Sequence, residues 1–355
     1  MFELNPSGLN WQRGVAMLDV GLVPLFVFWA IGYEQYLLSA LFGLMFAGMT
    51  DPGGGFGYRA SHIAVFGLLG AGLTALGFGL GAVDWGWLTL AAFAVTLAAG
   101  LAVAFGVRRF VAALLLNVWF IIALATAFGF HQSPSATSYT WAQVVAWAGG
   151  VALWAAVAFV VWLVRGRRDM PRPFAELPGD TSRRKLTWPV IMFAVIRAGA
   201  VAATVALAFG LNLSHGSWMP FAALAAMKPS LEQATLIGVQ RLAGAVIGAA
   251  AAALLLLVPA GEQGEQLLAV ERGLEVVALI FFMHAMAVRL VNYALYCAAI
   301  AAGALILLEL PQPSDYAAEG YRVLWTLCGV AIGVLTMVLS GPLATRTAKD
   351  LSRPS

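Results

Sequence analysis

The sequence predicts an all-α polytopic membrane protein with about twelve transmembrane helices, arranged as two parallel six-helix repeats. Hydrophobic residues make up 61% of the 355-residue chain, and the mean hydropathy is +0.87. Apolar runs of about twenty residues recur from one end to the other, and each is long enough to cross the hydrocarbon as a helix. The runs are continuously apolar, as in AAAALLLLVPA, whereas strands of a membrane β-barrel alternate apolar and polar residues.

The apolar runs define the expected spans in chain order. The second and eighth runs are short and lie beside turns rich in proline and glycine, so we expect these two spans to be tilted, broken or partly re-entrant. The N-terminal residues lack a basic segment and a cleavage site, so we expect the first run to remain as a helix. The expected spans are 14–32, 36–50, 59–82, 85–106, 109–129, 141–164, 190–210, 215–228, 232–258, 270–288, 290–309 and 321–340.

One polar segment, RGRRDMPRPFAELPGDTSRRK, separates two apolar halves and is the expected domain boundary. We therefore expect a first six-helix membrane repeat at 1–164, a basic cytoplasmic linker at 165–189, a second six-helix repeat at 190–340 and a cytoplasmic tail at 341–355. With both termini on the same side as this linker, seventeen of the twenty basic residues fall on that side. The positive-inside rule then predicts cytoplasmic termini, and the net charge of +3 reflects topology and gives no sign of nucleic-acid binding.

The two halves share sequence features at a nearly constant offset. Trp11 matches Trp188, Pro52 matches Pro229, and RFVAALL from Arg109 matches RLVNYAL from Arg289. Because each half holds an even number of spans, the halves enter the membrane in the same orientation and are related by an axis along the membrane normal. Such an axis is where a substrate path is expected, although plain duplication gives the same pattern.

The stretch AAMKPSLEQATLIGVQRLAGAVIGAA carries charges in apolar surroundings. Ser230 and Gln233 form a capping box, so a helix is expected to begin there at the cytoplasmic face. Arg241 either snorkels at the membrane boundary or, with Lys228, attracts an anion at the inner mouth of a path. Gly244 and Gly248 lie on one face of this helix and are expected to allow close helix packing.

The second half resembles the fusaric acid resistance protein and aromatic acid exporter family, most clearly over 188–340. The resemblance is carried by WMP from Trp218, KP at Lys228, Arg241 with Gly244 and Gly248, and RVLWTLCGVAIG from Arg322. The plant malate-type anion channels are distantly similar. The resemblance implies a bacterial inner-membrane efflux protein for aromatic carboxylates or related amphipathic anions. It also implies proton coupling and a periplasmic membrane-fusion (adaptor) partner. The chain departs from longer exporters in having only a short cytoplasmic region between its halves.

The halves differ in charge at matching positions. The place of Arg241 is taken in the first half by YRASHIAVFG, which carries Arg59 and His62, and Asp51 stands where the second half has Lys228. The difference is expected if one half binds anion and the other handles protons, and it is also what neutral drift leaves. We take Arg59 as a candidate substrate-binding residue and Asp51 and His62 as candidate proton-coupling residues.

Other polar residues inside the spans are further candidates. We expect Asp19 and Arg197 each to face another helix or water. Asp19 is then a candidate for proton coupling and Arg197 for substrate binding; alternatively they form a structural pair or anchor an interface. His284 is a candidate for proton coupling or a packing histidine. DPGGGFG at 51–57 lacks the Gly-Lys-Ser/Thr ending of a phosphate-binding loop, and both cysteines lie in apolar runs, so we expect no cofactor and no metal site.

Three functions remain open from the sequence. A secondary exporter, such as a proton antiporter, needs protonatable groups near its path, whereas an anion channel needs only a basic path. A membrane-embedded enzyme or a non-catalytic subunit of an efflux assembly needs neither. The sequence contains no paired metal ligands, nucleophile elbow or clustered catalytic carboxylates, so we do not expect an enzyme.

Overall fold

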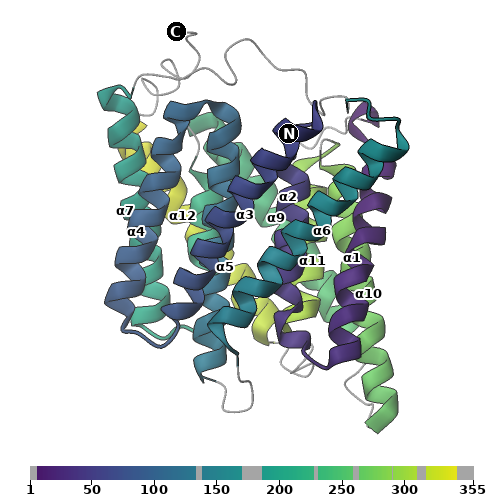
Figure 1. The fold of residues 1–355 in the computed structure, drawn as a ribbon. Coiled ribbons are helices and arrows are strands. Elements are labelled where there is room, and N and C mark those ends of the chain that lie inside the picture. Colours follow the sequence, from purple (N-terminus) through teal and green to yellow (C-terminus); the bar gives the residue numbers. More distant parts are fainter. Residues whose placement is uncertain are drawn as a thin grey trace. The chain divides into compact units, whose positions relative to one another are not determined.

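The computed structural model describes residues 6–132, 138–169, 186–227, 231–258, 264–289, 291–309 and 317–341. These residues form twelve α-helices, which Figure 1 labels in chain order. The helices are α1 Trp11–Ile31, α2 Leu37–Thr50, α3 Phe56–Gly79, α4 Trp85–Leu101, α5 Val107–Gln132, α6 Thr140–Val164, α7 Trp188–Gly210, α8 Trp218–Ala226, α9 Leu231–Leu256, α10 Gly264–Val288, α11 Tyr293–Glu309 and α12 Ala317–Leu339.

The predicted all-helical, multi-pass membrane architecture is confirmed, but twelve crossings are not. Within the described ranges, seven helical segments are long and apolar enough to span a membrane. α2 has 14 residues and α8 has nine, both below the roughly 20 that a crossing needs. Nearly every residue of these two helices is buried in protein. The seven segments are Gly14–Ile31, Phe56–Gly79, Trp85–Phe105, Arg108–Phe130, Thr140–Val164, Trp188–Gly210 and Val239–Leu256.

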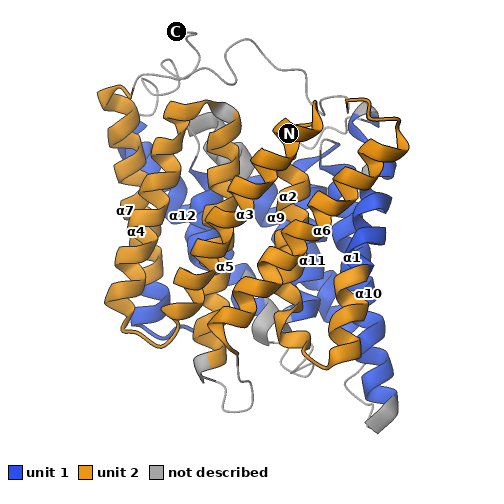
Figure 2. Cartoon of the chain, in the orientation of Figure 1, with its two compact units in different colours: residues 1–22, 207–341 blue, residues 23–206, 342–355 orange. Residues whose placement is uncertain are grey.

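The chain divides into two compact units, coloured separately in Figure 2. Unit 1 contains residues 1–22 and 207–341, and unit 2 contains residues 23–206 and 342–355. The cuts fall within α1 and α7, whereas the predicted domains divide the chain at the polar linker, most of which lies outside the described residues. The domain boundaries drawn from the sequence stay a prediction.

In unit 2, α2 and α3 both pack against α6, and α5 packs against α3 and α4. The contacts are close because glycines face neighbouring backbones: Gly150 of α6 lies against the Ala40 carbonyl of α2. Two large aromatic side chains fill the centre. Trp119 and Trp147 are fully buried and stacked, with ring centroids 4.8 Å apart. Their indole N–H groups donate to the Thr74 hydroxyl and the Gly67 carbonyl, so neither ring leaves a buried donor unsatisfied.

In unit 1 the helix pairs follow a matching order. α8 and α9 both pack against α12, and α11 packs against α9 and α10. Small residues make these contacts. A Cβ atom added to Gly248 of α9 would lie 2.5 Å from Ala301 of α11, and one added to Gly244 would lie 2.5 Å from Cys297. The predicted close packing at both glycines is therefore confirmed.

Candidate functional site

The turn between α2 and α3 is formed by Asp51, Pro52 and three glycines. Gly53 and Gly54 have φ angles of +67° and +79°, a region that residues with a Cβ rarely adopt. The backbone N–H of Gly53 donates to Asp51 Oδ1 at 3.0 Å. The glycine-rich DPGGGFG segment is thus a tight turn that folds the chain back over the Asp51 carboxylate.

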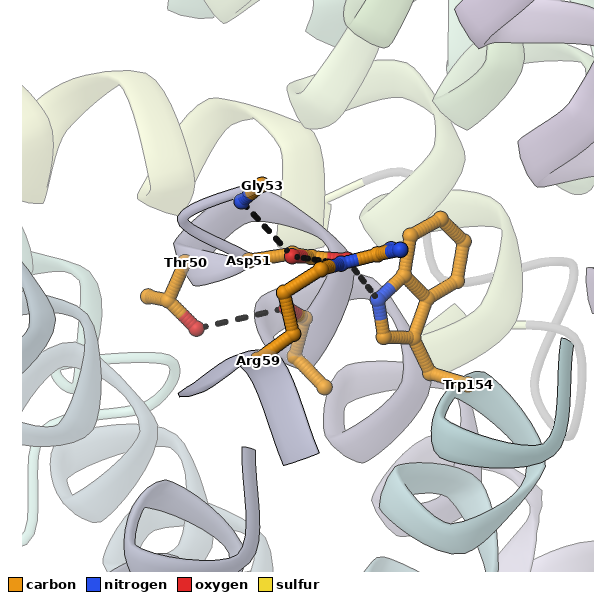
Figure 3. A network of polar contacts seen from close by, with 6 residues as sticks. Thr50, Asp51, Gly53, Arg59 and Trp154 are labelled. Carbon is orange, nitrogen blue, oxygen red and sulfur yellow. Dashed lines mark hydrogen bonds and ion pairs between the residues drawn. The ribbon is translucent and has the colours of Figure 1, made fainter. Parts of the chain in front are cut away.

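This turn brings Asp51 to Arg59, in the second turn of α3. Arg59 Nε donates to Asp51 Oδ1 at 2.9 Å and Nη2 donates to Oδ2 at 2.5 Å, so the guanidinium and carboxylate meet side by side. Trp154 of α6 adds an indole N–H donor to Oδ2 at 3.1 Å. Figure 3 shows the carboxylate enclosed by these donors. Both charged side chains are buried, with exposed fractions of 4% for Arg59 and 8% for Asp51.

Asp51 stays ionised in this setting. Burial raises the pKa of its carboxyl, but hydrogen bonds from Arg59, Gly53 and Trp154 and the positive charge of Arg59 outweigh burial and hold that pKa below its usual value. Asp51 is therefore a poor proton acceptor near neutral pH as long as Arg59 remains paired with it. Any proton that Asp51 carries has to arrive when this pairing changes.

Two buried nitrogen atoms beside this pair have no hydrogen-bond partner among the described residues. They are Nη1 of Arg59 and Nε2 of His62, one turn further along α3. Buried donors without partners are uncommon in folded proteins and often mark a place that water, an ion or a ligand occupies. Arg59 thus offers one N–H edge to a ligand while its other edge holds Asp51.

Further basic residues surround this position. Arg108 Nη1 lies 3.5 Å from the Tyr58 hydroxyl, and Arg108, Arg109 and Asp51 all act electrostatically on His62. Arg109 is exposed and Arg108 is partly exposed, whereas Arg59 is buried. The cluster therefore has an outer, solvated part on α5 and an inner, desolvated part on α3.

Aromatic rings from the start of α3 and from α6 pack together beside the turn. Phe56 stacks on Trp162 with ring centroids 5.1 Å apart, and Phe159 lies 5.2 Å from Phe56. Arg167 lies over the Trp162 ring at 5.9 Å, within the range of a cation–π interaction. Phe56 and the buried Arg59 are three residues apart at the start of α3, and Phe56 joins the α6 rings, an arrangement that suits an anion with an apolar body.

Unit 1 contains a second basic cluster. Arg241 of α9 is partly buried, and its Nε atom lacks a hydrogen-bond partner within the described part of the chain, as does Nη1 of Arg289. Arg241 interacts electrostatically with the Tyr293 and Tyr296 hydroxyls of α11, and Arg289 interacts in the same way with Tyr296. Lys228, the other predicted anion-attracting residue of this half, lies outside the described residues.

Three further predicted residues lie in α7, α1 and α10. Arg197 is buried in α7 with an exposed fraction of 4%, and Asp19 is an exposed residue of α1. His284 of α10 donates from Nδ1 to the Ile280 carbonyl at 2.8 Å and packs edge-on against Trp11, as a packing histidine would. Substrate-binding and proton-coupling roles for these residues stay predictions.

Two residues that sequence reasoning did not single out are notable in the structure. Trp154 completes the hydrogen bonding of Asp51, and a tryptophan in an apolar run gives no signal of that role. Glu275 is a buried carboxylic acid of α10, with an exposed fraction of 9%. A charged residue within an apolar helix is a recognisable signal in membrane proteins, so Glu275 was open to prediction.

The long apolar helices define a multi-pass membrane protein with charged side chains buried among its helices. Residues 201–336 match the family model described as fusaric acid resistance protein-like. This match confirms the resemblance over most of the second half of the chain. Neither the curated proteins nor the solved structures contain a match to this chain.

Proposed function

We propose that the protein is a secondary efflux transporter of the bacterial inner membrane that exports aromatic carboxylates or related amphipathic organic anions. In this proposal the termini are cytoplasmic, the two halves form parallel repeats, and export is coupled to protons. A periplasmic membrane-fusion protein is the expected partner, and the protein is not an enzyme. The match to the family model described as fusaric acid resistance protein-like supports efflux, because export is one way in which a membrane protein confers resistance to an acid.

The observation that carries the anion part is the buried guanidinium of Arg59 with one N–H edge unpartnered among the described residues. Burying a cation among apolar helices is costly, so such residues usually serve a substrate or ion path. A guanidinium edge fits a carboxylate oxygen. The aromatic rings of Phe56, Phe159 and Trp162 nearby favour an anion with an aromatic body.

The matching order of helix contacts supports the two-repeat arrangement. In unit 2 the short helix α2 and the long helix α3 pack against α6, and α3 also packs against α5. In unit 1 the short helix α8 and the long helix α9 pack against α12, and α9 also packs against α11. Arg59 and Arg241 lie on the corresponding long helices, α3 and α9. We propose that both contribute to anion binding, with Lys228 and Arg197, and that Asp19, Asp51, His62 and His284 are the candidate proton-coupling residues.

The proposal is tested with the purified protein in liposomes. Uptake of 4-hydroxybenzoate and of a dicarboxylate is followed first under an imposed pH gradient and then under an imposed voltage without one. Accumulation against a concentration gradient, driven by pH, is the expected result. Voltage-driven downhill flux that ignores pH would replace the carrier by an anion channel, a function for which the basic clusters around Arg59 and Arg241 would suffice.

Substitution of Arg241 tests its place in the site. We expect Arg241→Ala to abolish 4-hydroxybenzoate flux while the protein still inserts and folds, because a partly buried cation that attracts the anion is removed. Arg168→Ala is the matched control, since Arg168 is an exposed arginine and its loss leaves flux unchanged. Unchanged flux in Arg241→Ala would remove this residue from the site.

A further inference from the structure

The Asp51–Arg59 pair has a definite charge balance. One carboxylate and one guanidinium meet in a buried position and cancel, and among the described residues no other charged side chain forms an ion pair with them. Trp154 and the Gly53 N–H are neutral donors to the same carboxylate. The inner site is therefore electrically neutral when it holds no ligand.

A carboxylate that binds to Nη1 of Arg59 would change this balance. Two carboxylates would then share one guanidinium, and the inner site would carry a net negative charge in desolvated surroundings. In a desolvated site this excess negative charge is costly, and it raises the affinity of the two carboxyl groups for one shared proton. We propose that an organic carboxylate binds at Nη1 of Arg59 beside Asp51, and that this pair of carboxyl groups takes up one proton as the anion binds.

Other titratable and charged groups lie around the pair and could also compensate the charge of a second carboxylate. On α3 these are Tyr58 and His62, and on α5 they are Arg108 and Arg109. Asp169, after α6, lies near Gly55, at 3.6 Å from the position that a Cβ of Gly55 would take. The arginines of α5 are partly or fully exposed, so water screens their charges, and they compensate the second carboxylate less than a proton on Asp51 would.

The inference deepens the proposed function and rests on its claim that the chain carries an organic anion. It predicts the direction in which anion affinity changes with pH. Anion and proton bind together, so anion affinity rises as the pH falls, by about tenfold per pH unit when a full proton is taken up. A carrier that used this site alone would move anion and proton in the same direction. Exchange of one for the other requires a titratable group outside the pair, such as His62 or His284.

Calorimetric titration of the purified protein with benzoate tests the inference. The titration is repeated at one pH in two buffers that differ in their enthalpy of ionisation, because a proton taken up by the protein is released by the buffer. For the wild-type protein we expect enthalpies that differ between buffers and correspond to uptake of up to one proton per benzoate. Equal enthalpies in the two buffers, or no binding of benzoate, would overturn the inference, while liposome flux decides the proposed function separately.

Variants assign the proton and the anion to their residues. Asp51→Asn is expected to bind benzoate without proton uptake, and the double variant Asp51→Asn/Arg59→Gln, which buries no charge, is expected not to bind it. Asp84→Asn removes an exposed carboxylate of the same unit and should leave uptake intact. Proton uptake that persists in Asp51→Asn but is lost in His62→Gln would contradict the assignment to Asp51. Should Asp51→Asn fail to fold, the double variant and the wild-type buffer comparison still decide.

Discussion

The two units pair their helices in a matching order but treat their buried cations differently. In unit 2 Arg59 is held by a carboxylate that also receives N–H donors from Gly53 and Trp154. In unit 1 Arg241 lies near tyrosine hydroxyls, and the sequence position that matches Asp51 is Lys228, which is outside the described residues. The first half thus places an anion where the second half places a further cation.

The units also differ in how their helices touch. Both units bring glycines against neighbouring backbones, but unit 2 also contains two stacked, hydrogen-bonded tryptophan rings, Trp119 and Trp147. Rings held by specific hydrogen bonds fix one arrangement of their helices. The two units thus share an order of helix contacts but differ in the partners of their buried arginines and in their packing. Substitutions test each of these differences.

The largest effect is expected from removing the carboxylate of the unit 2 pair. Asp51→Asn leaves the Arg59 guanidinium buried without its counter-charge, and breaking such a pair costs about 3–5 kcal/mol. The thermal unfolding temperature of the detergent-solubilised protein should fall markedly. The double variant Asp51→Asn/Arg59→Gln should recover much of the loss, because no uncompensated charge remains. A fall in the double variant as large as in the single one would show that the pair itself is not what stabilises the turn.

The helices and their order could be predicted from the sequence because apolar runs and turn residues report directly on length and boundaries. α9 begins at Leu231, where the Ser230–Gln233 pattern predicts a helix start. The number of crossings could not be predicted as well. α2 and α8 are as apolar as true spans, but they are short and buried in protein, and hydropathy does not distinguish a lipid-facing surface from a protein-facing one.

The candidate site could be predicted in its residues but not in its pairing. Asp51, Arg59 and His62 stand out as polar residues beside apolar runs, yet the Asp51–Arg59 bond depends on the φ angles of Gly53 and Gly54. Trp154 is 103 positions from Asp51 in the chain, and only the packing of α2 and α3 on α6 brings it there. Local sequence carries no record of such a long-range contact.

A smaller effect is expected from weakening the hold on Asp51. Trp154→Phe keeps an aromatic ring but removes one donor to an ionised carboxylate, a bond worth about 1.5–3 kcal/mol. Because the pKa of Asp51 is lowered in the folded protein, the stability it contributes is present above the pKa of the unfolded chain and is lost as the pH falls through the folded-state pKa. The variant raises that folded-state pKa, so acid unfolding should begin at higher pH than in the wild type. An unchanged acid-unfolding curve would contradict the role assigned to Trp154.

The smallest effect concerns the close glycine contacts, tested on α9 and α11 of unit 1. Replacing glycine by alanine within a helix gains about 1 kcal/mol from helix propensity, and Gly72 of α3, with no atom within 4 Å of its added Cβ, should show that gain. Gly248→Ala places its Cβ 2.5 Å from Ala301 and 2.6 Å from the Ala298 carbonyl, so α9 and α11 have to separate. Overpacking of this kind costs about 1–3 kcal/mol, which offsets the propensity gain or exceeds it. Thermal unfolding of the two variants side by side measures the difference. If Gly248→Ala were stabilised as much as Gly72→Ala, the α9–α11 contact would be able to yield without cost, and close packing at Gly248 would not contribute to the stability of unit 1.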